Sequence, residues 1–82
     1  MVEIRFDKKF KAIFSKIKDE LLKDKIKKQI KKILENPEVG KPMRNIRKAT
    51  RELYIKPFRL SYYYDLKINL VYILDLYHKK NQ

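Results

Sequence analysis

In the segment Phe58-Arg59-Leu60-Ser61-Tyr62-Tyr63-Tyr64, large apolar side chains recur at every second position. Side chains of a β-strand point alternately to the two faces of its sheet. The apolar series that begins at Phe58 therefore shares one face, while Arg59, Ser61 and Tyr63 share the other. If helices cover the first face, Arg59 lies on the open face of the sheet. The alternative interpretation is an Arg that extends to solvent from a sheet edge.

Two further strands are predicted around this one. Upstream, residues 51–55 alternate apolar and other side chains, and Lys56-Pro57 marks a turn or sheet edge. Downstream, Asp65-Leu66-Lys67 fits a hairpin loop, and residues 68–76 form a dense apolar run that is typical of a central strand. Residues 78–82 then form a short polar tail. The C-terminal part of the chain therefore predicts antiparallel strands.

The N-terminal part has helical periodicity after a short strand. Residues 2–6 alternate apolar and polar side chains, and Asp7 can cap a helix. Two apolar stripes at helical spacing follow. The first consists of Phe10, Ile13, Phe14 and Ile17, and the second of Leu22, Ile26, Ile30, Ile33 and Leu34. The second helix should stop at residues 35–37, because Pro disfavours helix in the residue before it.

Residues 18–20 decide whether these stripes belong to one helix or two. No Gly or Pro forces a break there, so one long helix is an alternative. We favour a hairpin with Asp19 as the second cap, because a single exposed helix would leave its apolar stripe uncovered. Residues 37–50 hold the only Gly and predict an irregular connection, with a possible short strand at 42–44.

The element order β-α-α-β-β-β predicts an α+β fold. Its parts are an N-terminal strand, a helical hairpin, and antiparallel strands that form a three- to four-stranded sheet packed on the helices. A chain of 82 residues is long enough for one domain, residues 1–82. Its hydrophobic content of 44% favours a folded domain over a disordered basic tail.

The charge of the chain is its most unusual property. It has 22 Lys and Arg against 10 Asp and Glu, a formal net charge of +12. Repulsion at this density works against compaction, so it favours a polyanionic or acidic partner. The alternative is a Lys-rich solubilising surface.

Other classes are disfavoured by what the chain lacks. It has no Cys and one His, so we expect no disulfide, no metal site and no cofactor. No apolar run approaches membrane-spanning length and no signal peptide is evident, which predicts a cytoplasmic protein. An anionic membrane surface is an alternative partner for the Lys-rich helices.

Arg residues are concentrated in one part of the chain. Apart from Arg5, every Arg lies within residues 44–59, whereas the helices carry Lys. Arg offers a planar fork that matches phosphate, so we interpret this stretch as a surface for nucleic acid, RNA before DNA. The predicted phosphate-binding residues are Arg44, Arg47, Lys48, Arg51 and Lys56, and Tyr63 is predicted to stack on RNA bases.

His78 is the only imidazole in the chain. A single His on a surface tail usually has no catalytic role, yet His is the best general acid or base near neutral pH. RNA cleavage needs a group that accepts the 2′-hydroxyl proton, a group that donates to the leaving 5′-oxygen, and a cation for the charged phosphorane. A basic sheet face with one His could supply that set without metal.

The chain resembles the RelE/ParE superfamily of toxins from type II toxin–antitoxin modules. The resemblance spans nearly the whole chain. The matching residues are Asn36-Pro37 at the end of the second helix, Gly40-Lys41-Pro42-Met43, Arg51-Glu52-Leu53, Phe58-Arg59-Leu60-Ser61-Tyr62 and Leu76-Tyr77-His78-Lys79-Lys80. Each motif alone is loose, but their order and spacing together are specific. The fold that the resemblance implies matches the predicted element order.

The resemblance also implies candidate catalytic residues. The ribosome-dependent members look like metal-independent endoribonucleases that cut mRNA in the ribosomal A site. An Arg that contributes to their catalysis matches Arg59. Some members have a His near the end of the last strand, which matches His78, and others have a basic residue one step later, which matches Lys79.

The chain departs from the family pattern at several positions. Some members place a carboxylate base where this chain has Lys41, and others carry Lys where Glu52 and Tyr54 stand. No Tyr follows His78 at the C-terminal end. These departures leave open the ParE branch, whose members look like inhibitors of DNA gyrase that lack the nuclease residues.

The resemblance therefore implies the toxin component of a type II toxin–antitoxin system. The first expectation is a ribosome-dependent mRNA endoribonuclease that inhibits translation. The alternatives are a ParE-like toxin that inhibits DNA gyrase and a plain basic RNA-binding domain. The implied partners are the ribosome with its mRNA, or DNA gyrase, and an acidic cognate antitoxin whose extended or helical segment would cover the basic face.

Overall fold

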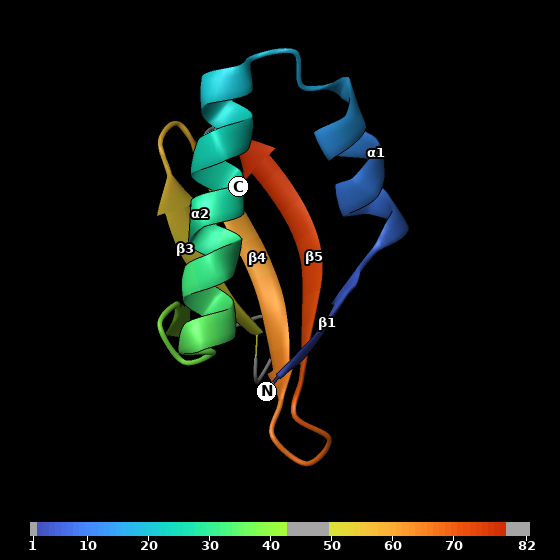
Figure 1. Ribbon diagram of the computed structural model, residues 1–82, viewed down its shortest axis with the longest axis vertical. Helices are drawn as coiled ribbons and strands as arrows, with labels where there is room; N and C mark the ends of the chain where they lie inside the picture. The colour runs from blue at the N-terminus through green and yellow to red at the C-terminus, as the bar shows by residue number, and fades with distance from the viewer. Residues whose placement is uncertain (1, 43–49, 79–82) are drawn as a thin grey trace.

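The computed structural model describes residues 2–42 and 50–78, which form two helices and a five-stranded sheet (Figure 1). In chain order the elements are β1 (Glu3–Phe6), α1 (Lys8–Lys16), α2 (Glu20–Glu35), β2 (Lys41–Pro42), β3 (Thr50–Ile55), β4 (Phe58–Asp65) and β5 (Leu70–His78). The strands lie in the order β1-β5-β4-β3-β2. Helix α1 packs against β5 and α2 against β3. The predicted α+β fold is confirmed.

Both helices are capped at their N-terminal end by an aspartate, as predicted. The Asp7 carboxylate accepts a hydrogen bond from the backbone N–H of Lys9 at 2.8 Å. The Asp19 carboxylate accepts two, from Leu21 and Leu22, at 3.0 and 3.2 Å. An N-cap of this kind stabilises a helix by about 1 kcal/mol. The helical hairpin is therefore confirmed, and the alternative of one long helix is wrong.

The sheet has five strands rather than the predicted three to four. The two-residue strand β2 pairs antiparallel with β3, and Met43 and Arg44 of the possible strand at 42–44 lie outside the described residues. Strand β1 pairs in parallel with β5, with Glu3 opposite Leu70. Alternation identifies β1 as a strand but not its partner, because a parallel neighbour far along the chain leaves no local signal.

The last strand is shifted by two residues from the predicted 68–76. Residues 66–69 form the hairpin turn, where Asn69 has a φ of 53°, and β5 continues to His78. Asn tolerates this left-handed conformation better than most residues do. His78 therefore belongs to the sheet and not to a polar tail.

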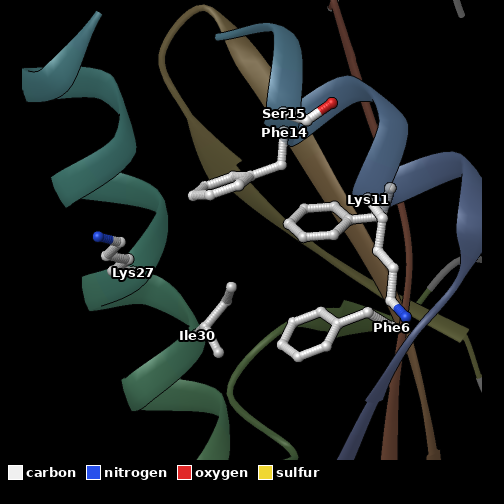
Figure 2. Close-up of a pocket in the computed structure, with 7 residues that line it drawn as sticks. Phe6, Lys11, Phe14, Ser15, Lys27 and Ile30 are labelled. Atoms are coloured by element: carbon white, nitrogen blue, oxygen red, sulfur yellow. The ribbon is translucent and has the colours of Figure 1, made fainter. Parts of the chain in front are cut away.

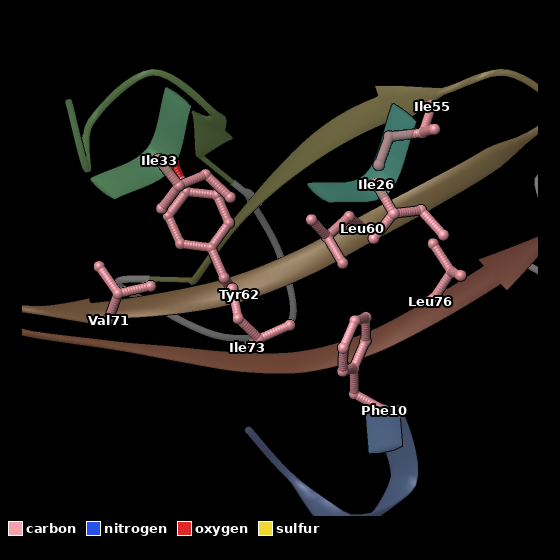
Figure 3. Packing of buried hydrophobic residues seen from close by; sticks show 9 residues of the cluster. All are labelled: Phe10, Ile26, Ile33, Ile55, Leu60, Tyr62, Val71, Ile73 and Leu76. Carbon is pink, nitrogen blue, oxygen red and sulfur yellow. The ribbon is translucent and has the colours of Figure 1, made fainter. Parts of the chain in front are cut away.

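The core lies between the sheet and the two helices (Figure 3). Its buried residues are Phe10 from α1, Ile26 and Ile33 from α2, Ile55 from β3, Leu60 and Tyr62 from β4, and Val71, Ile73 and Leu76 from β5. Fully burying a side chain of this size contributes about 1.5–3 kcal/mol. The predicted alternation of β4 is confirmed, because Leu60 and Tyr62 face the helices.

One buried hydroxyl ties the chain after α2 to the sheet. Tyr62 Oη accepts a hydrogen bond from the Gly40 N–H and donates one to the Pro37 carbonyl, both at 2.8 Å. The backbone of Gly40 approaches so closely that a Cβ there would lie 2.7 Å from Tyr62 Oη. Gly is thus required at this position by the contact with the sheet.

Replacing Tyr62 with Phe should lower the free energy of unfolding by roughly 1–3 kcal/mol, because Gly40 N–H and the Pro37 carbonyl lose their partner. Chemical denaturation near neutral pH measures the change. Tyr64→Phe is the matched control, because the Tyr64 hydroxyl donates to Asn69 at an exposed site. The control should change stability by less than about 0.5 kcal/mol. Equal losses in the two variants would contradict a special role for Tyr62.

The same hydroxyl should make stability depend on alkaline pH. Burial raises the pKa of Tyr62 above its ordinary value of 10.0, so the unfolded chain loses this proton first. As pH rises through 10.0 the unfolded state binds fewer protons than the folded state, and stability falls. The stability difference between the native protein and Tyr62→Phe should therefore shrink from about pH 9 to about pH 11. A constant difference across that range would refute the raised pKa.

Candidate functional site

The face of the sheet opposite the helices, here called the open face, carries a cluster of polar and aromatic side chains. Directly opposed residues of antiparallel strands point to the same face. Arg59 of β4 lies opposite Tyr54 of β3 and Tyr77 of β5, and Glu52 lies opposite Ser61. Because Arg59 and Ser61 alternate with buried Leu60, all of these residues lie on the open face.

Glu52, Arg59 and Tyr77 are joined by two short hydrogen bonds, and we call them the open-face cluster. Arg59 Nη1 donates to Glu52 Oε1 at 2.7 Å, and Tyr77 Oη donates to Glu52 Oε2 at 2.8 Å. Each carboxylate oxygen thus receives one donor. The side chains of Arg59 and Glu52 keep 25% and 18% of their surface exposed, so the cluster is partly shielded from water but reachable.

The charge of Arg59 is compensated inside this cluster. Its guanidinium also lies beside the Tyr54 ring, with Cζ 6.0 Å from the ring centroid. Within residues 2–42 and 50–78, the buried Arg59 Nε has no hydrogen-bond partner. A partly buried ion pair held by geometry of this kind fixes the direction of the guanidinium more firmly than an exposed pair does.

Two of the predicted phosphate-binding residues have different surroundings from Arg59. Arg51 Nη1 donates to the carbonyls of Glu38 and Gly40 at 3.0 and 2.8 Å, and its Nη2 lies 3.7 Å from the Glu38 carboxylate. In the register Arg51 is opposite Tyr62, so it lies on the helix side of the sheet. Lys56 is exposed in the turn between β3 and β4.

The other predicted binding residues are placed only in part. Tyr63 lies half-buried on the open face, opposite Tyr72 of β5. Arg44, Arg47 and Lys48 lie outside the described residues, as does the predicted catalytic residue Lys79. The structure thus brings Tyr63 to the same face as Arg59 and does not bring Arg51 there.

The structure does not bring His78 and Arg59 together. His78 lies opposite Phe58 in the register, and the two rings meet edge to face with centroids 5.5 Å apart. Since Phe58 and Arg59 are consecutive in one strand, their side chains point to opposite faces. His78 is therefore on the helix side, whereas Arg59 is on the open face.

Sequence reasoning missed Glu52 and Tyr77 as members of the site. One signal was present, because Glu52 is the only acid among the basic residues of 41–59. An isolated acid inside a basic stretch often pairs with one of its neighbours. Nothing local pointed to Tyr77, which precedes the more conspicuous His78.

A second feature is an apolar pocket between the two helices, which Figure 2 shows. Its volume is about 410 Å³. Its apolar wall consists of Phe6, Phe10, Phe14 and Ile30, and its polar lining of Lys11, Ser15 and Lys27. Phe10 stacks on both Phe6 and Phe14 with centroid distances of 5.7 Å. The pocket is thus an aromatic surface bordered by positive charge.

Residues 2–42 and 50–78 hold no group of three His, Cys, Asp or Glu side chains that could bind a metal ion. Neither α1 nor α2, the helices found in those ranges, is long and apolar enough to cross a membrane.

Solved structures with a similar fold include toxins and toxin–antitoxin complexes. A chain of the intact Escherichia coli RelBE complex has a TM-score of 0.82 and 17% identity, covering 95% of this chain and 96% of that chain. A chain of the Mycobacterium tuberculosis RelBE2 complex has a TM-score of 0.79 and 24% identity, covering 95% of this chain and 98% of that chain. The YoeB/ParE toxin from Agrobacterium tumefaciens has a TM-score of 0.83 and 12% identity, covering 94% of this chain and 98% of that chain. These similarities establish a RelE-like fold.

A family model described as the ParE toxin of the type II toxin–antitoxin system, parDE, matches residues 4–82. The chain therefore belongs to the ParE toxin family of type II toxin–antitoxin systems. A comparison with curated proteins found no match.

The ion pair of the open-face cluster should be measurable by a double-mutant cycle. Arg59→Ala leaves Glu52 with one partner fewer and Glu52→Ala leaves a partly buried guanidinium unpaired, so each should destabilise the fold. The double variant should lose less than the two single variants combined, with a coupling of about 0.5–3 kcal/mol. Urea denaturation measures all three. Additive losses would show that the two side chains do not stabilise each other.

Proposed function

We propose that this chain is the toxin of a type II toxin–antitoxin system and that it stops translation by cutting mRNA on the ribosome. The observation that carries this proposal is the position of Arg59 on the open face. Its guanidinium is held 2.7 Å from Glu52 and lies beside the Tyr54 ring, and Tyr77, which donates to the same carboxylate, is opposite Arg59 in the register. A fixed cation beside aromatic rings is suited to a phosphate flanked by unstacked bases.

Arg59 would stabilise the negative charge that develops on the phosphoryl oxygens during cleavage. A preorganised donor at that point typically changes the rate by about 10²–10³-fold. The aromatic side chains Tyr54 and Tyr63 on the same face offer stacking surfaces for bases. The net charge of +12 would favour approach to ribosomal RNA. The proposal does not require His78 beside Arg59.

We further propose that an acidic antitoxin segment inserts apolar side chains into the pocket between α1 and α2. Phe6, Phe10 and Phe14 offer an apolar seat, and Lys11 and Lys27 would meet acidic residues that flank the inserted ones. An amphipathic helix that docks in a groove makes this combination of contacts. The RelB-containing structures with the same fold support an antitoxin as partner.

A second candidate function is inhibition of DNA gyrase without RNA cleavage. It is favoured by the compensation of the Arg59 charge by Glu52, which reduces its attraction for phosphate, and by the ParE description of the family. In that case the open face would meet a protein target.

Cell-free translation with primer extension on the message tests the first function. The native protein should produce cuts spaced by codons, and only when ribosomes are present. Arg59→Ala should reduce cleavage by about 10²–10³-fold. Lys25→Ala removes one positive charge from an exposed position on α2 and should cleave normally. An intact message together with blocked gyrase supercoiling would select the second candidate. An intact message with only salt-sensitive RNA binding would indicate a plain RNA-binding domain.

Reversing the charges at the pocket should weaken antitoxin binding. The double variant Lys11→Glu, Lys27→Glu should bind the antitoxin encoded beside the toxin gene at least about tenfold less tightly, mainly through slower association. Surface-based binding kinetics at two salt concentrations measures this. The double variant Lys25→Glu, Lys28→Glu is the control, because it reverses the same number of charges at exposed positions of α2 outside the pocket lining. If both variants lose affinity equally, the pocket has no special part in binding.

A further inference from the structure

Glu52, Arg59 and Tyr77 come from three neighbouring strands. Glu52 is on β3 and Tyr77 on β5, so the carboxylate and the phenol approach from opposite sides of the strand that carries Arg59. The β4 residue opposite Glu52 is Ser61. Its small side chain leaves room for Glu52 and Tyr77 to meet above the strand at 2.8 Å.

These groups fit a task that the proposed function leaves unassigned. Cleavage of RNA by its own 2′-hydroxyl requires a base for that hydroxyl and an acid for the leaving 5′-oxygen. Near neutral pH a Glu carboxylate is an acceptor, and a Tyr phenol is a donor. His78, which the sequence predicts for this task, lies on the other face of the sheet.

We propose that Glu52 is the general base and Tyr77 the general acid of the cleavage, an assignment that rests on the proposed function. A phosphate that binds Arg59 draws the guanidinium away from Glu52 Oε1, which then accepts the 2′-hydroxyl proton. The 2′-oxygen forms a bond to phosphorus. The bond from phosphorus to the 5′-oxygen breaks, and Tyr77 gives its proton to that oxygen.

The hydrogen bond between Glu52 and Tyr77 returns the site to its starting state. After the cut, Glu52 carries a proton and Tyr77 is a phenolate. The 2.8 Å contact between Oε2 and Oη lets that proton pass from the carboxyl group to the phenolate. The products are a 2′,3′-cyclic phosphate and a 5′-hydroxyl end, and no co-reactant is consumed.

Other charged groups near the pair are accounted for. Lys41 of β2 lies opposite Glu52 in the register and is exposed. Asp75 of β5 lies opposite Ser61, and its carboxylate pairs with Lys9 of α1 at 3.2 Å. Among the described residues, the charged groups placed beside Glu52 are thus Arg59, which donates to it, and Lys41 in the neighbouring strand.

Single-turnover cleavage on message-programmed ribosomes tests the assignment. Glu52→Gln keeps the size of the side chain and its hydrogen bond from Arg59, so the fold and ribosome binding should be retained while the cleavage rate falls by about 10²–10⁴-fold. Glu38→Gln is the control, because Glu38 is also paired with an Arg but lies away from the open face. The control should cleave at the native rate.

The pH dependence of the rate distinguishes a proton-transfer role from a structural one. If a base and an acid both transfer protons, the native rate should rise with pH, pass through a maximum and fall again. Tyr77→Phe should lower the rate and lose the alkaline decrease, whereas Tyr64→Phe should keep both. Glu52→Asp should cleave more slowly but keep the increase of the rate with pH on the acidic side of the maximum. This variant replaces Glu52→Gln as the test if Glu52→Gln does not fold.

Each contrary outcome has a distinct meaning. If the native protein makes no ribosome-dependent cut, the proposed function fails. If it cuts and Arg59→Ala does not, but Glu52→Gln cuts at the native rate, the assignment of the base is wrong. If folded Glu52→Gln loses both ribosome binding and cleavage, Glu52 has a binding role and its assignment as the general base is wrong. An alkaline decrease that persists in Tyr77→Phe would overturn the assignment of the acid.

Discussion

Strand β4 lies between two hydrogen-bonded neighbours, so its side chains have only two directions available. Leu60 and Tyr62 are completely buried in the direction of the helices. A slip of one residue would expose them and bury Arg59, at a cost far larger than any contact of Arg59 itself. The orientation of the candidate site is therefore a consequence of core packing, and the same strand supplies the core on one side and the site on the other.

The sequence alone was sufficient to predict those structural features that depend on residues close together along the chain. The alternation of β4 correctly predicted that Arg59 lies on the open face, and Asp7 and Asp19 were correctly predicted as helix caps. Both predictions succeed because strand periodicity and helix capping are local properties. The meeting of Glu52 with Tyr77 is different, because 25 residues separate them and their contact depends on the order of three strands. Local patterns contain no information about that order.

His78 and Arg51 show the same limit at the level of single residues. Because the predicted strand ended at Leu76, the sequence assigned His78 to neither face of the sheet. Its position on the helix side follows only from the register, in which His78 is opposite Phe58. Arg51 belongs to the stretch that is rich in Arg, but its guanidinium binds the carbonyls of Glu38 and Gly40. Composition identifies where charge is concentrated. It does not show which charged side chains already form ion pairs or hydrogen bonds within the fold. The net charge of the chain therefore does not predict the charge of a site.

The parallel pairing of β1 with β5 sets the order in which the chain can fold. Glu3 and Phe6 are synthesised long before Leu70 and Ile73, the residues with which they pair. A contact across so much of the sequence has a high entropic cost until the intervening chain has folded. The edge strand β1, and with it the side of the helix pocket that Phe6 forms, can therefore be completed only after β5 has been synthesised. Until then a growing chain has an incomplete sheet and an incomplete pocket.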